Sequence, residues 1–183
     1  VGRTRVFHRS ERLFLRPAFP EDSGAILAGI GEESIVRNLA RAPWPYTLDD
    51  ARSFAALPQD MRLPHFLVTL PGIGVIGSAG MGEHEGEPEL GYWIARAHWG
   101  RGYATEAAAA VLRIARTLGH RRVVAGHFTD NPASGKVLRK LGFVPTGRPG
   151  QRFSLARGGM VDSVEYALEL EADMDPAPFA RAA

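Results

Sequence analysis

The chain has 183 residues, of which 45% are apolar and 23% charged, and its formal net charge is +2. Such a chain is long enough for one domain with a hydrophobic core, and its charge is too small to indicate nucleic acid as a partner. No apolar run approaches the roughly 20 residues of a membrane-spanning helix, so we expect no membrane partner. The sequence contains no cysteine, which excludes disulfides, thiolate metal sites and a cysteine nucleophile.

Other expectations concern location, metals and assembly. The first residues, Val1–Arg5, carry no apolar segment of the kind found in signal peptides, so we expect a cytoplasmic protein. No spacing of histidine and acidic residues is typical of a metal site, and we expect none. We expect a monomer or a homodimer.

The first part of the chain predicts one strand and three helical segments. Glu11–Arg16 alternates as a strand does, and Pro20 is a favourable first residue of a helix. Further helical segments are expected over residues 32–39 and 47–57, with the proline-containing loop Ala42–Tyr46 between them.

The rest of the chain alternates between strands and helices. One strand is expected to begin at Phe143, and the others cover residues 65–70, 73–81, 89–95, 122–128 and 162–170. Two helices are expected over residues 103–118 and 132–141, the second capped by Asn131. Residues 172–183 are rich in proline and alanine, and we expect a loosely ordered tail there.

This order of elements predicts the fold class. The strand, helix and strand between Glu89 and Phe128 require a right-handed parallel crossover, whereas the two strands between residues 65 and 81 form an antiparallel hairpin. We therefore expect residues 1–183 to form a single α/β domain, with a mixed sheet of about seven strands flanked by helices.

The turn before the helix at Tyr103 is a candidate anion site. Gly100 and Gly102 form a tight turn that opens directly into an alanine-rich helix. The free backbone N–H groups at a helix N-terminus favour phosphate, and Arg96 and Arg101 add positive charge beside them. The turn lacks the third glycine of a dinucleotide-binding fingerprint and the Gly-Lys-Ser/Thr of a Walker loop.

Three motifs follow one another along the chain. They are Glu89-Leu-Gly-Tyr-Trp-Ile94, Trp99-Gly-Arg-Gly-Tyr-Ala-Thr-Glu-Ala107, and Asn131-Pro-Ala-Ser134 with Leu141-Gly-Phe143. In this order they resemble the GNAT acyl-CoA N-acyltransferases, most of all the RimJ/RimL-like branch, which includes N-terminal acetyltransferases of ribosomal proteins. The likeness covers nearly the whole chain. It implies an N-acetyltransferase that uses acetyl-CoA and whose sheet splays between the strands at 89–95 and 122–128.

The resemblance also implies which residues bind the cofactor. The pyrophosphate of acetyl-CoA would bind the backbone N–H groups of the turn, and the pantetheine arm would run beside the strand at 89–95. The thioester carbonyl would accept a hydrogen bond near Trp93 or Ile94, and Asn131 would contact the pantetheine. With the two arginines of the anion site, the expected cofactor contacts are Trp93, Ile94, Arg96, Arg101, Gly102, Tyr103, Ala104, Thr105, Asn131 and Ser134.

Forming an amide from a thioester needs a neutral amine, a polarised carbonyl and a stabilised leaving thiolate. Because the chain has no cysteine, we expect direct attack by a primary amine in a ternary complex, helped by positioning and electrostatic stabilisation. Ser134 is the candidate that hydrogen-bonds or protonates the thiolate, and its alternative role is helix capping. Many relatives carry a tyrosine acid in this helix, where this chain has Leu138.

Glu89 is the candidate general base, acting directly or through water, and the alternative is a surface carboxylate at a strand end. The ribosomal-protein branch can place a glutamate base after the second helix, where this chain has Phe153. His84 is a weaker candidate. Trp99 stands where many relatives have Gln or Arg, and we expect it to pack the turn or to stack near the cofactor.

The acceptor would be a small-molecule amine or a protein N-terminus. Its site would be shaped by the early helices, the loop Ala42–Tyr46 and residues 147–160. Trp44, Tyr46 and Phe153 suggest an apolar wall there, or are ordinary packing aromatics. Two alternatives to an enzyme stay open: a CoA-binding module with little or no turnover, and an unrelated nucleotide-binding domain.

Overall fold

The computed structural model describes residues 7–170, and the expected tail at 172–183 lies outside them. The strands are β1 (His8–Arg9), β2 (Phe14–Arg16), β3 (His65–Leu70), β4 (Gly74–His84), β5 (Glu87–Ile94), β6 (Arg122–Phe128), β7 (Val144–Ser154) and β8 (Gly159–Glu169). The helices are α1 (Ser23–Ile30), α2 (Glu33–Val36), α3 (Leu48–Ala55), α4 (Tyr103–Thr117) and α5 (Pro132–Lys140), with 3-10 turns at Pro20–Asp22 and Arg96–His98.

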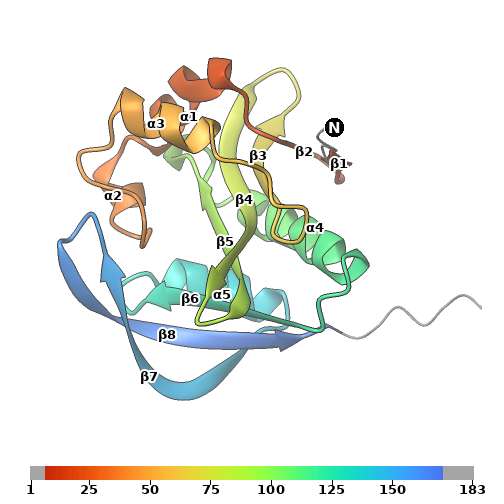
Figure 1. The fold of residues 1–183 in the computed structure, drawn as a ribbon, viewed down its shortest axis with the longest axis vertical. Coiled ribbons are helices and arrows are strands. Elements are labelled where there is room, and N and C mark those ends of the chain that lie inside the picture. The colour runs from red at the N-terminus through yellow and green to blue at the C-terminus, as the bar shows by residue number, and fades with distance from the viewer. Residues whose placement is uncertain (1–6, 171–183) are drawn as a thin grey trace, which may run out of the picture.

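One mixed sheet organises the described residues, in the order β1-β2-β3-β4-β5-β6-β8-β7 (Figure 1). Neighbouring strands are antiparallel except β5 and β6, which are joined through α4. The predicted α/β class with a mixed sheet and flanking helices is confirmed, with eight strands in place of about seven.

The sheet opens between its two parallel strands. β4 and β5 pair continuously, from Gly77 opposite Ile94 to His84 opposite Glu87. By contrast, Glu89 opposite Val124 is the single registered pair between β5 and β6. The two strands diverge beyond that pair (Figure 1), as the resemblance implied. We call the place where their backbones are no longer paired the opening.

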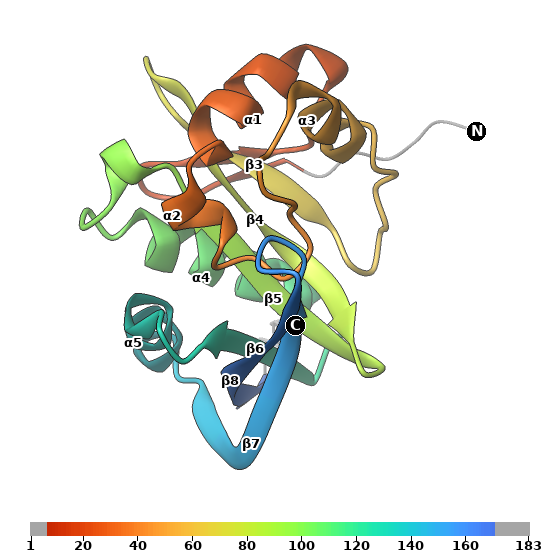
Figure 2. The same cartoon turned by 90° about the vertical axis from the view of Figure 1, so that its left-hand side faces the viewer.

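Helices cover both faces of the sheet. Because side chains alternate along a strand, Phe66 and Val68 of β3 lie in the large core with α4, whereas Leu67 lies in a second core with α1 and α3. On β5, Ile94 belongs to the first core and Trp93 to the second. Figure 2 shows α1 and α3 on one side of the sheet and α4 on the other.

Small residues bring α4 and α5 close to the sheet. Four alanines of α4 are fully buried, or nearly so, against the strands: Ala107, Ala108, Ala110 and Ala115. On α5, Gly135 lies against β6, where an added Cβ would stand 2.5 Å from Nε2 of His127. Asn131 caps α5 as predicted, because its Oδ1 accepts a hydrogen bond from the backbone N–H of Ser134.

Several predicted elements have different bounds in the structure. The first predicted strand is shortened to β2, because the backbone N–H of Ser10 bonds Leu13 O in a turn. The helical segment at 32–39 is reduced to the four residues of α2. β7 continues through Pro145 and Pro149, which an edge strand tolerates because a proline there breaks no ladder bond on its free side. Among the described helices, none is long and apolar enough to cross a bilayer.

Candidate active site

The turn before α4 presents backbone amides at a helix N-terminus. Gly100 and Gly102 adopt φ angles of +73° and +80°, which allow the chain to reverse into the helix. The N–H of Glu106 donates to Gly102 O at 3.0 Å, which closes the first turn of the helix. The amides that precede Glu106 have no partner one turn back within the helix. Backbone amides at such a position can donate to an anion.

Arg12, between β1 and β2, makes several hydrogen bonds to this turn and to the first turn of α4. Its backbone N–H and its Nε each donate to the Glu106 carboxylate at 2.7 Å, and its Nη1 donates to Arg101 O at 3.1 Å. Although burial raises the pKa of Glu106, hydrogen bonds from Arg12 and Ser10 hold it below its ordinary value. Arg12 thus pairs a carboxylate that would otherwise repel a phosphate one turn away. No spacing in the sequence pointed to this pair, which spans 94 residues.

Trp99 joins the turn to the end of β5. Its indole N–H donates to Ile94 O at 2.6 Å. Of the two roles expected for Trp99, packing the turn is the one that this contact supports.

The backbone of β5 has one edge toward β4 and one toward the opening. Ala95 N–H donates to Ile76 O at 2.8 Å, so its N–H points to β4. Because these groups alternate along a strand, Trp93 N–H also points to β4, and those of Tyr92 and Ile94 point to the opening. Of the two residues expected near the thioester carbonyl, Ile94 is therefore the one whose N–H faces the opening. The Trp93 ring packs in the second core against Gly29.

Ser134 meets a tyrosine across the opening. Its hydroxyl lies 2.9 Å from that of Tyr92 on β5, so it is not used as a second helix cap. Burial raises the pKa of Tyr92 to about 12, which keeps the phenol protonated. Leu138, at the position where many relatives have a tyrosine, is 1% exposed in the core. Sequence reasoning quoted Tyr92 within a motif and assigned it no role.

Glu89 lies on the other face of the sheet, in an ion pair with Arg152 of β7. The same guanidinium bonds Glu165 of β8, with Nε 2.7 Å from Oε1. A Cβ on Gly126 of β6 would stand 2.6 Å from Arg152 Cζ, so a glycine is what lets the guanidinium lie over β6. No local signal in the sequence indicates this role of Arg152, which directly precedes Phe153. Glu89 is thus held by a cation rather than free at a strand end.

Burial and charge act in opposite directions within this cluster. Burial lowers the pKa of Arg152. Its bonds to Glu165 and Glu89 raise the pKa by more than burial lowers it, so the net shift is upward. Burial raises the pKa of Glu165, and the bond from Arg152 holds it below its ordinary value. His84, at the end of β4, acts on Glu165 in the same direction as Arg152. Arg152 and Glu165 are therefore both ionised at neutral pH.

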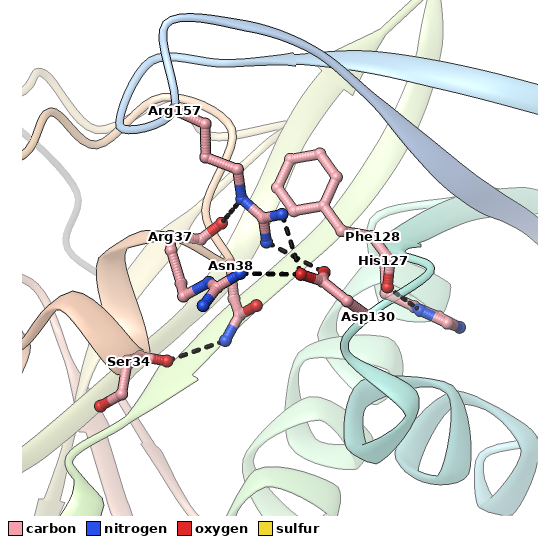
Figure 3. Close-up of polar contacts among 7 residues, drawn as sticks. All are labelled: Ser34, Arg37, Asn38, His127, Phe128, Asp130 and Arg157. Carbon is pink, nitrogen blue, oxygen red and sulfur yellow. Dashed lines mark hydrogen bonds and ion pairs between the residues drawn. The ribbon is translucent and has the colours of Figure 1, made fainter.

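Two arginines converge on Asp130, directly before the cap of α5 (Figure 3). Arg157, in the turn between β7 and β8, bonds both carboxylate oxygens at 2.9 and 3.0 Å, and Arg37, after α2, bonds one at 2.9 Å. Arg157 also donates to Arg37 O and lies over the Phe128 ring. We call Asp130, Arg37 and Arg157 the Asp130 clasp. The clasp ties the segment after α2 and the turn between β7 and β8 to the start of α5.

Several expected site residues make contacts or face directions that the sequence did not indicate. Arg96 is exposed and 3.5 Å from Glu32. Phe153 is 52% exposed on the face of β7 opposite Arg152, so it does not contribute to an apolar wall with Tyr46, which packs in the second core. Within residues 7–170, no group of three or more histidines and acidic residues is arranged to hold a metal ion.

Comparisons with known proteins show the family to which this chain is related. Residues 12–144 match the acetyltransferase (GNAT) domain family. The N-acetyltransferase YoaA of Bacillus subtilis, itself uncharacterised, is 31% identical over 148 residues, which cover 75% of this chain and 82% of that protein.

Two solved structures share the fold. One is RimL, a ribosomal-protein alpha-N-acetyltransferase in complex with coenzyme A, with a TM-score of 0.77 and 22% identity, covering 92% of this chain and 100% of that one. The other is MccE, a microcin self-immunity acetyltransferase in complex with acetyl-CoA and AMP. Its TM-score is 0.73 and its identity 18%, and the match covers 87% of this chain and 93% of that one.

The chain belongs to the GNAT acetyltransferase family, and it is an acetyltransferase. The unrelated nucleotide-binding domain that the turn alone left open is thereby excluded.

Proposed function

We propose that the protein transfers an acetyl group from acetyl-CoA to a primary amine within the opening between β5 and β6. One observation carries the proposal: groups suited to the two halves of the reaction lie on opposite faces of that opening. The hydroxyls of Ser134 and Tyr92 lie on the α5 face, and the Glu89 carboxylate lies on the other. The amides of the turn before α4 lie at one end.

The donor half uses the backbone first. The amides of Arg101 to Thr105 bind the pyrophosphate, with the exposed side chains of Arg96 and Arg101 as added charge. The pantetheine lies along the open edge of β5 and against Asn131. Ile94 N–H polarises the thioester carbonyl, and Trp93 supports that strand from the second core.

The chemical step is direct attack by the amine in a ternary complex. Ser134 hydrogen-bonds the leaving thiolate, close to the N-terminus of α5, where the helix dipole favours negative charge. Glu89 is three residues from Tyr92, or about 10 Å along the strand, and lies on the opposite face of the sheet. Across that distance, Glu89 accepts the amine proton through water.

The acceptor is a protein N-terminus, which is the kind of target named for RimL, or a small-molecule amine. We place the chain in the RimJ/RimL-like branch on its motifs, as a cytoplasmic enzyme that is a monomer or a homodimer. Phe153, where that branch can have a glutamate base, argues for a different target from that of RimL itself.

Thiol release tests this proposal. The chain has no cysteine, so a thiol reagent reports free CoA alone. The protein is incubated with acetyl-CoA and a panel of amines that includes peptides with free N-termini, amino acids, polyamines and aminoglycosides. We expect thiol release that depends on the amine. Tight CoA binding without release by any amine would instead support a CoA-binding module.

A further inference from the structure

Tyr92 reaches across the opening between β5 and α5. Its phenol oxygen is 2.9 Å from Ser134 Oγ and 3.3 Å from Ser134 O, and the two residues are 42 positions apart in sequence. The neighbouring residues of β5 point elsewhere: Trp93 packs in the second core and Gly91 has no side chain. Tyr92 thus connects β5 to Ser134, whose hydroxyl is the candidate that binds the leaving thiolate.

We propose that Tyr92 is a positioning residue for acetyl transfer, and that its hydroxyl donates to Ser134 Oγ and turns the Ser134 proton toward the departing sulfur. This inference rests on the proposed function. A serine hydroxyl has one proton and rotates freely. When a neighbouring donor occupies one of its lone pairs, its own proton is directed elsewhere.

The surroundings of both hydroxyls allow this direction of donation, because either hydroxyl can be the donor in the bond between them. Tyr92 is half-buried and its phenol is neutral, because burial raises its pKa to about 12. The backbone N–H of Ser134 is already bound by Asn131 Oδ1, which fixes the first turn of α5 and therefore the place of the hydroxyl. A chain of two hydroxyls ending on an anion is strengthened by polarisation along it.

The step balances without a charge on either hydroxyl. The amine nitrogen forms a bond to the acetyl carbon, and its proton passes through water to Glu89. The C–S bond then breaks and its electron pair goes to sulfur. The Ser134 O–H donates to that thiolate while Tyr92 O–H donates to Ser134, and the thiolate takes a proton from solvent. Both hydroxyls therefore stabilise the anion by hydrogen bonds alone.

A double-mutant cycle tests the inference. For Tyr92→Phe we expect kcat to fall about tenfold, less than the roughly 10²–10³-fold of a lost direct donor, with the KM for acetyl-CoA unchanged. Ser134→Ala should lower kcat more, and the double variant should be no slower than Ser134→Ala, because Tyr92 acts only through that serine. Tyr166→Phe is the matched control, since it also removes a buried, hydrogen-bonded phenol oxygen but contacts His127 and Arg139 instead.

The outcomes separate the two proposals. If the native protein releases no thiol with any amine, the proposed function fails. If it is active and Tyr92→Phe matches it in kcat, or the two substitutions multiply in the double variant, the inference about Tyr92 is overturned. A loss of folding in Tyr92→Phe, seen as a melting temperature far below that of Tyr166→Phe, would show a structural role instead and would also overturn it.

Discussion

Arg157 bonds both carboxylate oxygens of Asp130, and Asp130 immediately precedes the Asn131 cap of α5. The turn between β7 and β8 is thereby fastened to the helix that carries Ser134. A backbone bond from Leu155 N–H to Ala40 O fastens the same turn to the segment after α2. The segment after α2 and the turn between β7 and β8 are therefore both linked through one carboxylate to the start of the helix that carries Ser134.

Loosening the Asp130 clasp should affect the acceptor more than the fold. In Arg157→Ala we expect a loss of about 0.5–1 kcal/mol in the free energy of unfolding, because Asp130 is 44% exposed and Arg157 20%. The KM for the amine should rise several-fold while the affinity for CoA is kept. Urea unfolding and steady-state kinetics measure these quantities, with the exposed Arg148→Ala on the same hairpin as the control. A change in CoA affinity and none in the amine KM would contradict this role.

Removing the Arg152 guanidinium should lower the free energy of unfolding, and the size of this loss should depend on pH. Arg152→Met leaves Glu89 and Glu165 half-buried without their cation, which we expect to cost about 3 kcal/mol at pH 7. Glu165 then loses the bond that lowers its pKa while burial still raises it. The folded variant therefore binds more protons than the unfolded chain and regains stability as the pH falls toward 5. Urea unfolding at both pH values measures this. An equal loss at both would show that packing, not charge, is what Arg152 supplies.

Negative charge at the turn before α4 should weaken CoA binding. Gly102→Asp places a carboxylate beside the proposed pyrophosphate position, and we expect at least about a tenfold loss of affinity. Gly102→Asn is the matched control, because asparagine tolerates the positive φ of this position about as well as aspartate does and carries no charge. Isothermal titration with CoA compares the two. Equal affinities would remove this turn from the phosphate site.

Stability should fall as the pH drops below about 6.5, in part through His65. Burial lowers the pKa of His65, and its Nε2 lies 3.0 Å from the Gln59 amide nitrogen. Between the folded pKa and 6.5 the unfolded chain binds the extra proton, so acidification favours unfolding. His65→Asn should flatten the decrease in unfolding free energy between pH 7 and pH 5. His8, whose pKa is also lowered by burial, is replaced separately by Gln to measure its own share. A slope unchanged in His65→Asn would contradict the assignment.

Local signals in the sequence predicted the parts of the site that are built from consecutive residues. The glycine turn before α4, the Asn131 cap and the strand at Glu89 all depend on neighbours within a few positions. Such features follow from backbone conformation and helix capping, which one stretch of chain determines by itself.

Contacts between distant segments were not predictable in this way. Arg12 with Glu106, Arg152 with Glu89 and Tyr92 with Ser134 join residues 94, 63 and 42 positions apart. Their pairing depends on strand order and register, which no local spacing records. One signal was available: alternation along β5 puts Tyr92 and Glu89 on opposite faces, so it predicts that they serve different halves of the reaction.

The order of substrate binding tests the central claim most directly. Initial rates of thiol release are measured while acetyl-CoA and the best amine are both varied. Transfer in a ternary complex at the opening between β5 and β6 predicts double-reciprocal lines that intersect. Parallel lines, which signify an acetylated enzyme intermediate, would contradict direct attack by the amine, and so would a rate of thiol release independent of the amine.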